Sequence, residues 1–270
     1  TDILDPLVMP ARQRLFTVLV LLLMMAEVFA AAEGLSDDIT RRLKAQAYRA
    51  YYGKGEPDNH ERALLLYEQA AERGDAEAQF IYGGMLYQGQ GREAPDKHNG
   101  FKWLLKAAEQ GKESPESLGI IGAMYLRGNA VPQNYMEAEK WLNKAAERGN
   151  AAAQNDLAYL YYHGLGGAPD YRKALELYEQ AALQGDVVAQ ANTGLMYAAG
   201  VGTDRDRARG YAWYSLAASR GNTAASMNRN SLMLEMSWEE LNRAQALSLE
   251  LYRRVEHVAA PKMIAPEQED

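Results

Sequence analysis

The fold is decided by the stretch Trp141-Leu142-Asn143-Lys144-Ala145-Ala146-Glu147-Arg148-Gly149-Asn150, because it recurs four more times with the same residue types in the same places. The glycines of the five copies lie 37, 38, 36 and 36 residues apart. A fixed period in this range is typical of a repeat array. The other copies are Leu66–Asp75, Trp103–Lys112, Leu177–Asp186 and Trp213–Asn222.

The stretch predicts the end of one helix and the start of the next. Trp141 and Ala145 are four residues apart and share one helix face, where the large side chain supplies buried area and the small one lets a neighbouring helix approach. Gly149 suits a left-handed turn at the helix end. Asn150 then suits the N-cap of the following helix. The same N-cap role is expected of Asp75, Asp186 and Asn222, and of Ser114 ahead of Pro115.

The rest of the chain reads as helices joined by short loops. No segment shows the alternation that is typical of a strand, and breakers such as Pro95-Asp96 and Pro169-Asp170 precede the helices that carry the repeated stretch. The helix before each of these loops carries a small residue three positions before a tyrosine, as at Gly194 and Tyr197. The predicted helices are 37–52, 59–73, 76–88, 97–110, 115–127, 135–148, 151–163, 171–184, 187–199, 206–220, 223–235 and 238–256.

Composition and motifs exclude several classes of function. A formal charge of -7 argues against a nucleic-acid partner, which needs a basic surface. The chain has no cysteine, so it has no disulfides and no thiol chemistry. Four histidines spread over separate regions do not suggest a metal site, and no Ser-His-acid set or close carboxylate pair suggests catalysis. Arg73-Gly74-Asp75 is explained as a helix end, and Gly89-Gln90-Gly91 as a turn without the flanking strand of a phosphate loop.

Residues 1–32 have the order of a secretory signal peptide. Arg12 and Arg14 precede an apolar run from Leu15 to Ala26, and three alanines follow at positions 30–32. The alternative is a membrane anchor, but the apolar run is shorter than the roughly 20 residues that a spanning helix needs. We therefore expect a bacterial protein that is periplasmic or secreted, with membrane contact only through a signal that is left uncleaved.

Repeats four and five carry a family resemblance. Ala189-Gln190-Ala191-Asn192-Thr193-Gly194-Leu195-Met196-Tyr197, Gly200-Val201-Gly202 and Ala217-Ala218-Ser219-Arg220-Gly221-Asn222 resemble a Sel1-like repeat, which is related to the tetratricopeptide repeat. The resemblance implies five repeats within residues 33–222, the first of them degenerate. Residues 223–257 would be closing helices and 258–270 a flexible tail.

The resemblance implies an all-α fold, in which helix-turn-helix repeats form a curved α-solenoid. Its concave face would be lined mainly by the first helix of each pair and would bind a protein or peptide, as in a non-enzymatic scaffold or adaptor of the bacterial envelope. No cofactor is implied. Some cysteine-rich relatives are linked to cell-wall or β-lactam binding, so a protein that binds or hydrolyses such compounds is the alternative, although this chain lacks their cysteines.

The residues one helical turn away from the packing positions are the candidates for the concave face. Tyrosine and arginine are apt there, because these side chains often anchor interfaces. The alternative for any of them, and especially for Met85, Leu126 and Leu195, is ordinary core between repeats. The predicted partner-binding residues are Arg49, Tyr52, Met85, Gln88, Asn155, Tyr159 and Tyr162.

Overall fold

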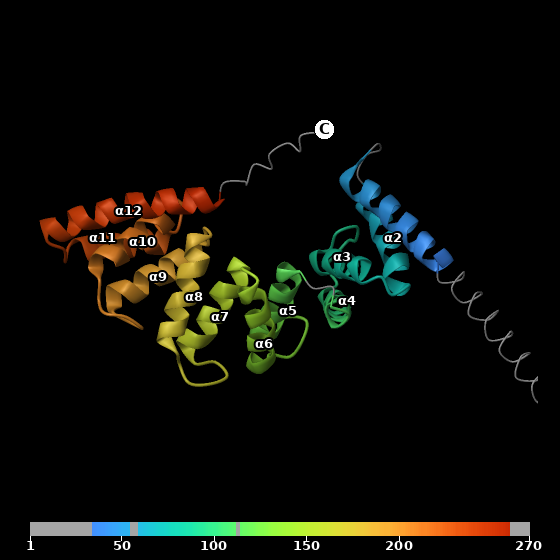
Figure 1. Cartoon of the computed structure of the whole chain (residues 1–270), viewed down its shortest axis with the longest axis horizontal. Helices are drawn as coiled ribbons and strands as arrows, with labels where there is room; N and C mark the ends of the chain where they lie inside the picture. Colours follow the sequence, from blue (N-terminus) through green and yellow to red (C-terminus); the bar gives the residue numbers. More distant parts are fainter. Residues whose placement is uncertain (1–33, 55–58, 112–113, 260–270) are drawn as a thin grey trace, which may run out of the picture. The chain divides into compact units, whose positions relative to one another are not determined.

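The computed structural model describes residues 34–54, 59–111 and 114–259 (Figure 1). Within these residues all regular structure is helical and no strand occurs, so the predicted all-α repeat fold is confirmed. The described chain divides after Ala107 into two compact units, and each is described by itself. The predicted signal segment 1–32, Pro57-Asp58 and residues 260–270 of the predicted tail lie outside the described residues.

The helices agree closely with the predicted ranges. Residues 34–52 are helical, and α3, α5, α7 and α9 match their predicted bounds. The largest differences lie at the two ends, where helical residues begin at 34 rather than 37 and the last helix ends at 259 rather than 256. The labelled helices are α2 (His60–Glu72), α3 (Ala76–Gln88), α4 (Lys97–Glu109), α5 (Pro115–Arg127), α6 (Tyr135–Glu147), α7 (Ala151–His163), α8 (Tyr171–Leu183), α9 (Val187–Ala199), α10 (Arg207–Ser219), α11 (Thr223–Met233) and α12 (Trp238–Ala259).

Three residues, Arg148, Gly149 and Asn150, connect α6 to α7 at the junction between two repeats. Gly149 adopts a φ of 84°, a conformation that side chains other than glycine rarely take. The backbone N–H groups of Gly149 and Asn150 donate to the carbonyls of Ala146 (2.9 Å) and Ala145 (3.0 Å), which satisfies the end of α6. The Asn150 side chain then accepts a bond of 2.8 Å from the Ala153 N–H and caps α7. The predicted helix end and N-cap are both confirmed.

Small residues bring the paired helices close together. A Cβ atom added to Gly122 on α5 would lie 2.6 Å from Leu142 Cγ on α6, so the facing helix leaves no room for a side chain. Ala145, at the packing position predicted from the repeat, has no exposed surface. The repeat pattern of large and small residues therefore sets the distance between helices.

Buried glutamines join consecutive repeats, a feature that the sequence analysis did not single out. The Gln154 side chain on α7 donates to the Ala146 carbonyl at 3.2 Å, and Gln79 and Gln190 make the equivalent bonds to Ala71 and Ala182 at 3.1 Å. Each bond reaches back from the start of one repeat to the last turn of the previous one. It satisfies polar atoms that would otherwise be buried without a partner.

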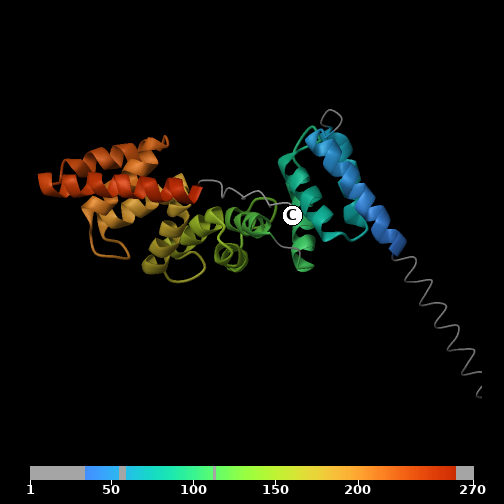
Figure 2. The same ribbon diagram turned by 45° about the horizontal axis from the view of Figure 1, so that its top comes forward.

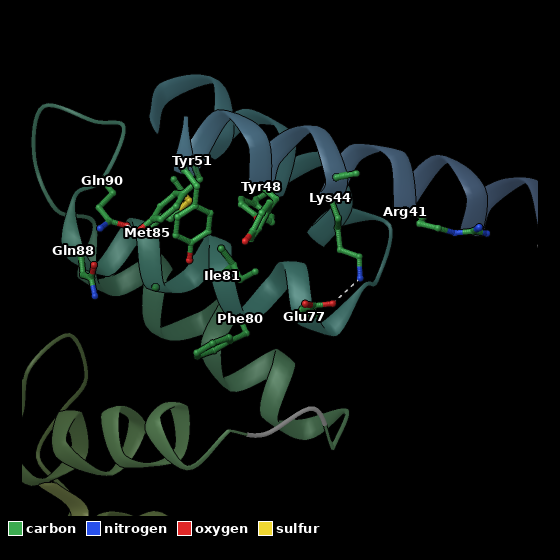
Figure 3. Close-up of a pocket in the computed structure, with 14 residues that line it drawn as sticks. Arg41, Lys44, Tyr48, Tyr51, Glu77, Phe80, Ile81, Met85, Gln88 and Gln90 are labelled. Atoms are coloured by element: carbon green, nitrogen blue, oxygen red, sulfur yellow. Dashed lines mark hydrogen bonds and ion pairs between the residues drawn. The ribbon is translucent and has the colours of Figure 1, made fainter. Parts of the chain in front are cut away.

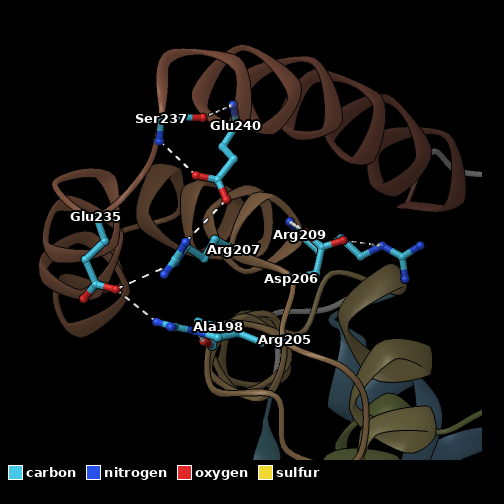
Figure 4. A network of polar contacts seen from close by, with 8 residues as sticks. All are labelled: Ala198, Arg205, Asp206, Arg207, Arg209, Glu235, Ser237 and Glu240. Carbon is cyan, nitrogen blue, oxygen red and sulfur yellow. Dashed lines mark hydrogen bonds and ion pairs between the residues drawn. The ribbon is translucent and has the colours of Figure 1, made fainter.

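The last helix, α12, packs along α10 and is held there by ion pairs (Figures 1 and 2). Arg243 lies 2.9 Å from Asp206. Arg207 lies 3.5 Å from Glu240 (Figure 4). Arg220 adds a pair of 3.0 Å with Glu256 near the other end of α12. The residues of this network come from the loop before α10, from α10 itself and from α12. No helix in the described part of the chain is long and apolar enough to cross a membrane.

The packing of Ala145 gives a test of the fold. We expect Ala145→Leu to lower the free energy of unfolding by about 1–3 kcal/mol, because added methylene groups have no space in the closely packed helix pair. Urea denaturation measures the change. Ala246→Leu on the exposed surface of α12 is the control and should have little effect; equal stability of the two variants would contradict the helix-face assignment.

Candidate functional site

The N-terminal unit contains a hollow of about 600 Å³ between the helix of residues 34–52 and α3 (Figure 3). We call it the tyrosine hollow. Its basic and acidic side chains, Arg41, Lys44 and Glu77, lie toward one end, whereas Gln88 and Gln90 lie at the other. The middle is apolar and aromatic, formed by Tyr48, Tyr52, Tyr67, Phe80, Ile81 and Met85.

The tyrosines form a connected group of rings. The ring centroids of Tyr48 and Tyr52 lie 4.6 Å apart, and those of Tyr51 and Tyr52 lie 4.8 Å apart. Tyr52 keeps 60% of its surface exposed, whereas Tyr67 beneath is almost fully buried. Burial, together with the nearby Tyr52 and Glu77, raises the pKa of Tyr67 to about 12, so its hydroxyl stays protonated at neutral pH. The hollow therefore offers neutral aromatic surface, and we find no activated nucleophile in it.

Polar contacts fix both ends of the tyrosine hollow. Lys44 Nζ lies 2.8 Å from Glu77 Oε2 and 3.0 Å from Asp75 Oδ2, which joins the first helix to the start of α3. At the other end the Tyr51 hydroxyl donates to Gln90 Oε1 at 2.9 Å. These contacts hold the walls of the hollow in place without filling it.

The C-terminal unit has two hollows of about 480 Å³ that share Arg127, Asn155 and Asp156. The Arg127 guanidinium Nη2 donates to both carboxylate oxygens of Asp156, at 2.8 and 3.0 Å. Asn155 Oδ1 is buried and accepts no hydrogen bond from the described residues. The group thus combines one ion pair with one acceptor that a ligand or water could satisfy.

Asp156 departs from its counterparts in the other repeats. The same position of the first helix holds Ile81 and Ile120 in earlier repeats, and Asn192 and Asn228 in later ones. Asp156 is nearly buried, and burial raises the pKa of its carboxyl, although Arg127 acts in the opposite direction. A charge at this position therefore destabilises the folded state unless the ion pair compensates for its burial.

A row of exposed apolar side chains follows α7 and α9 beside these hollows. Tyr159 is 44% exposed, Val188 55% and Leu195 41%. Tyr159 and Val188 both line the hollow next to Arg127. We call Tyr159, Val188 and Leu195 the exposed row. Large apolar side chains left exposed beside a polar group are typical of an interaction surface.

The structure separates the predicted partner-binding residues into those that line hollows and those that do not. Tyr52, Met85 and Gln88 line the tyrosine hollow, and Asn155 and Tyr159 line the hollow next to Arg127. Arg49 is exposed but lies outside the lining of the tyrosine hollow.

Met85 and Tyr162 lie in packing positions. Met85 is 2% exposed and belongs to the hydrophobic core beneath the tyrosine hollow, which is the alternative that the sequence left open for it. Tyr162 is half-buried against the core of the C-terminal unit. Leu126 is likewise buried, whereas Leu195 is exposed and is not part of the core. A partner contact at any of the predicted residues stays a prediction.

The sequence patterns did not predict four of the residues that line these hollows, namely Tyr48, Phe80, Asp156 and Val188. Tyr48 stands three residues before Tyr51, where later repeats carry a small residue, and it is exposed at the tyrosine hollow. Asp156 could have been found by comparing equivalent positions among the repeats, since it is the one acid among isoleucines and asparagines. No group of three His, Cys, Asp or Glu residues in the described part of the chain could hold a metal ion.

The Sel1 repeat family model matches residues 43–75, 76–112, 116–150, 151–186 and 187–222. The chain belongs to the Sel1 repeat family. These matches cover the helices that carry the exposed row and the two hollows beside Arg127, and the part of the tyrosine hollow from residue 43 onward. Sel1 repeat proteins are generally scaffolds that bind other proteins.

Two solved structures resemble this Sel1 repeat protein. A Sel1 repeat protein from Oxalobacter formigenes is 30% identical with a TM-score of 0.61, and the match covers 78% of this chain and 87% of that one. The protective antigen c5321 of uropathogenic Escherichia coli, which has an SLR fold, is 25% identical with a TM-score of 0.57. That match covers 86% of this chain and 57% of c5321. No curated protein sequence matches significantly.

The burial of Asp156 predicts a dependence of stability on pH. Because the pKa of Asp156 is raised in the folded state, its contribution to stability is greatest below the unfolded pKa and is lost as the pH rises through the folded pKa. We therefore expect Asp156→Asn, which restores the residue type of Asn192, to raise the free energy of unfolding at neutral pH. The gain should shrink in mild acid, where Asp156 is itself protonated.

Urea denaturation at neutral and at mildly acidic pH measures both effects. Arg127→Gln is the matched variant, because it removes the partner and leaves the buried carboxylate, so it should destabilise at neutral pH. Lower stability of Asp156→Asn at neutral pH would show that the ion pair outweighs the cost of burying the charge.

Proposed function

We propose that this chain is a non-enzymatic scaffold of the bacterial envelope that holds a protein or peptide partner against the first helices of its repeats. The observation that carries the proposal is the exposed row on α7 and α9 beside the Arg127–Asp156 pair. It combines apolar anchors with a fixed polar group, which is the composition of a protein interface.

The chemistry of the hollows supports binding more than catalysis. The nearly buried Asp156 carboxylate is paired with Arg127 through two hydrogen bonds. Burial raises the pKa of Tyr67 and, toward the other end of the chain, of Tyr178 and Tyr214, so these hydroxyls stay protonated. Groups held in these states position ligands well and are poor nucleophiles.

The repeat architecture suits a scaffold for a further reason. The packing side of each first helix is fixed by small residues and buried glutamines, whereas the exposed side is free to vary between repeats. Tyr159 and Leu195 occupy the same position of consecutive repeats, 36 residues apart, and both remain exposed. Tyr159 and Leu195 thus place two anchors one repeat apart in the same helix layer, as an extended partner requires.

Capture of a partner tests the scaffold. The chain from Glu33 onward would be used to retain proteins from the envelope fraction of the source organism, and the retained protein would be purified and titrated by calorimetry. We expect the double variant Tyr159→Ser, Val188→Ser to weaken binding by about tenfold or more, since buried anchors of this kind contribute about 1–3 kcal/mol.

The matched control is the double variant Leu249→Ser, Tyr252→Ser, which removes exposed apolar side chains of similar size from α12. It should bind as the wild type does. A partner that is lost from the control and kept by the exposed-row variant would place the interface on the closing helix and contradict the proposed face.

Export is a separate part of the proposal and has its own test. A fusion of residues 9–32 to alkaline phosphatase should be active in intact cells, because the enzyme needs disulfides that form outside the cytoplasm. Leu22→Arg interrupts the apolar run and should abolish that activity. Equal activity of the two fusions, or none in either, would count against an exported protein.

A further inference from the structure

The tyrosine hollow exists because one helix position lacks a side chain. Gly84 on α3 lines the hollow, and a Cβ atom added there would meet no atom within 4 Å. Ala123, Tyr159 and Leu195 stand at the same position in the next three repeats. The fold therefore accepts large side chains at this position, and glycine leaves their space empty in the N-terminal unit.

The empty space has the chemistry of an apolar anchor pocket. Buried Met85 and the half-buried side chains of Phe80 and Ile81 contribute apolar surface, and the exposed ring of Tyr52 stands beside them. Tyrosines bury much surface and lose little rotamer freedom on binding. A bulky aliphatic or aromatic side chain from a partner would thus replace the side chain that Gly84 lacks.

Residues 34–54, which form one wall of the tyrosine hollow, carry a charge opposite to that of the whole chain. Residues 34–54 contain five basic side chains and two acidic ones, although the chain carries a formal charge of -7. The Arg41 side chain is 76% exposed at one end of the hollow, and Lys54 lies 5.3 Å over the ring of Tyr48. Asp75 and Glu77 neutralise Lys44, and Asp38 pairs with Arg42 at 2.6 Å. Arg41 lies farther from Asp38, at 3.8 Å, and keeps most of its side chain exposed to solvent. Carboxylates are the complementary groups.

We propose that the tyrosine hollow binds an acidic linear segment of a partner protein, with one bulky apolar side chain inserted over Gly84. This inference rests on the proposed scaffold function and names the class of partner segment. The apolar side chain supplies the buried area, and the flanking carboxylates lie near Arg41 and Lys54. Binding should weaken as salt is added, because exposed charge pairs are screened.

Fluorescence anisotropy with a labelled peptide tests the proposal. The probe is a short peptide with one phenylalanine between runs of glutamate, and the two comparison peptides replace the phenylalanine by alanine or the glutamates by lysine. We expect the probe to bind the full chain, and either replacement to weaken binding by about tenfold or more, which corresponds to 1.4 kcal/mol.

The decisive variant is Gly84→Leu, which fills the hollow with the side chain that Leu195 carries at the same position. It should weaken probe binding by about tenfold or more without lowering the melting temperature, since leucine has a better helix propensity than glycine. Gly167→Leu is the matched control, because a Cβ atom there also meets no atom within 4 Å. Arg41→Glu should weaken the probe and strengthen the lysine peptide.

Three results would overturn the inference. Equal binding of the probe by Gly84→Leu and wild type would show that the hollow is not the site, and tighter binding of the lysine peptide would reverse the assigned charge. An oligomer that sedimentation detects in wild type and that Gly84→Leu dissolves would assign the hollow to a second copy of the chain. If Gly84→Leu loses the probe but the partner of the exposed row is still captured, the two interfaces are independent.

Discussion

The ends of four of the five repeats depend on a short connection in which a glycine with positive φ is followed at once by a capping side chain, at Gly74, Gly149, Gly185 and Gly221. At Gly149 and Asn150 this connection satisfies the last carbonyls of α6 and the first N–H groups of α7. Because the connection is short, it also fixes the position and direction of the next helix relative to the previous one. Buried glutamines such as Gln154 add a side-chain hydrogen bond across the same junction. The packing between repeats follows from these constraints.

The same constraints divide the first helix of each repeat into two sides. Packing restricts the residue types on one side, whereas the residues on the other side can vary. Small residues such as Gly122 and Ala158 face the neighbouring helices and cannot change without a clash or a cavity. The position that holds Gly84 in one repeat and Leu195 in another faces solvent, so the chain can vary it without loss of fold. Recognition chemistry is therefore concentrated at positions that the repeat itself does not determine.

This division explains how much could be predicted from the sequence. The ends of α3, α5, α7 and α9 were predictable because glycine and N-cap residues mark them locally. The exposure of Tyr159 could not be predicted, because helical spacing shows which residues share a helix face but does not show whether another helix covers that face. Met85 illustrates the limit, since this candidate for the partner surface is 2% exposed and belongs to the core, yet it also lines the tyrosine hollow. The role of Asp156 could not be predicted, because it depends on an ion pair with Arg127, 29 residues away, and on the space between the helices that carry the two residues.

The contacts of the closing helix bear on how long the array can be. In the last loop Arg205 stands where Pro95 and Pro169 precede the N-caps of earlier repeats, and the neighbouring Asp206 and Arg207 are the residues that hold α12. The ion pairs to α12 thus come from α10 and from the residues that flank it, Asp206 and Arg220. A duplication of any repeat upstream would lengthen the protein by one unit and keep the same terminus. Relatives of different length can therefore arise by gain or loss of whole units, each with a new exposed side to diversify.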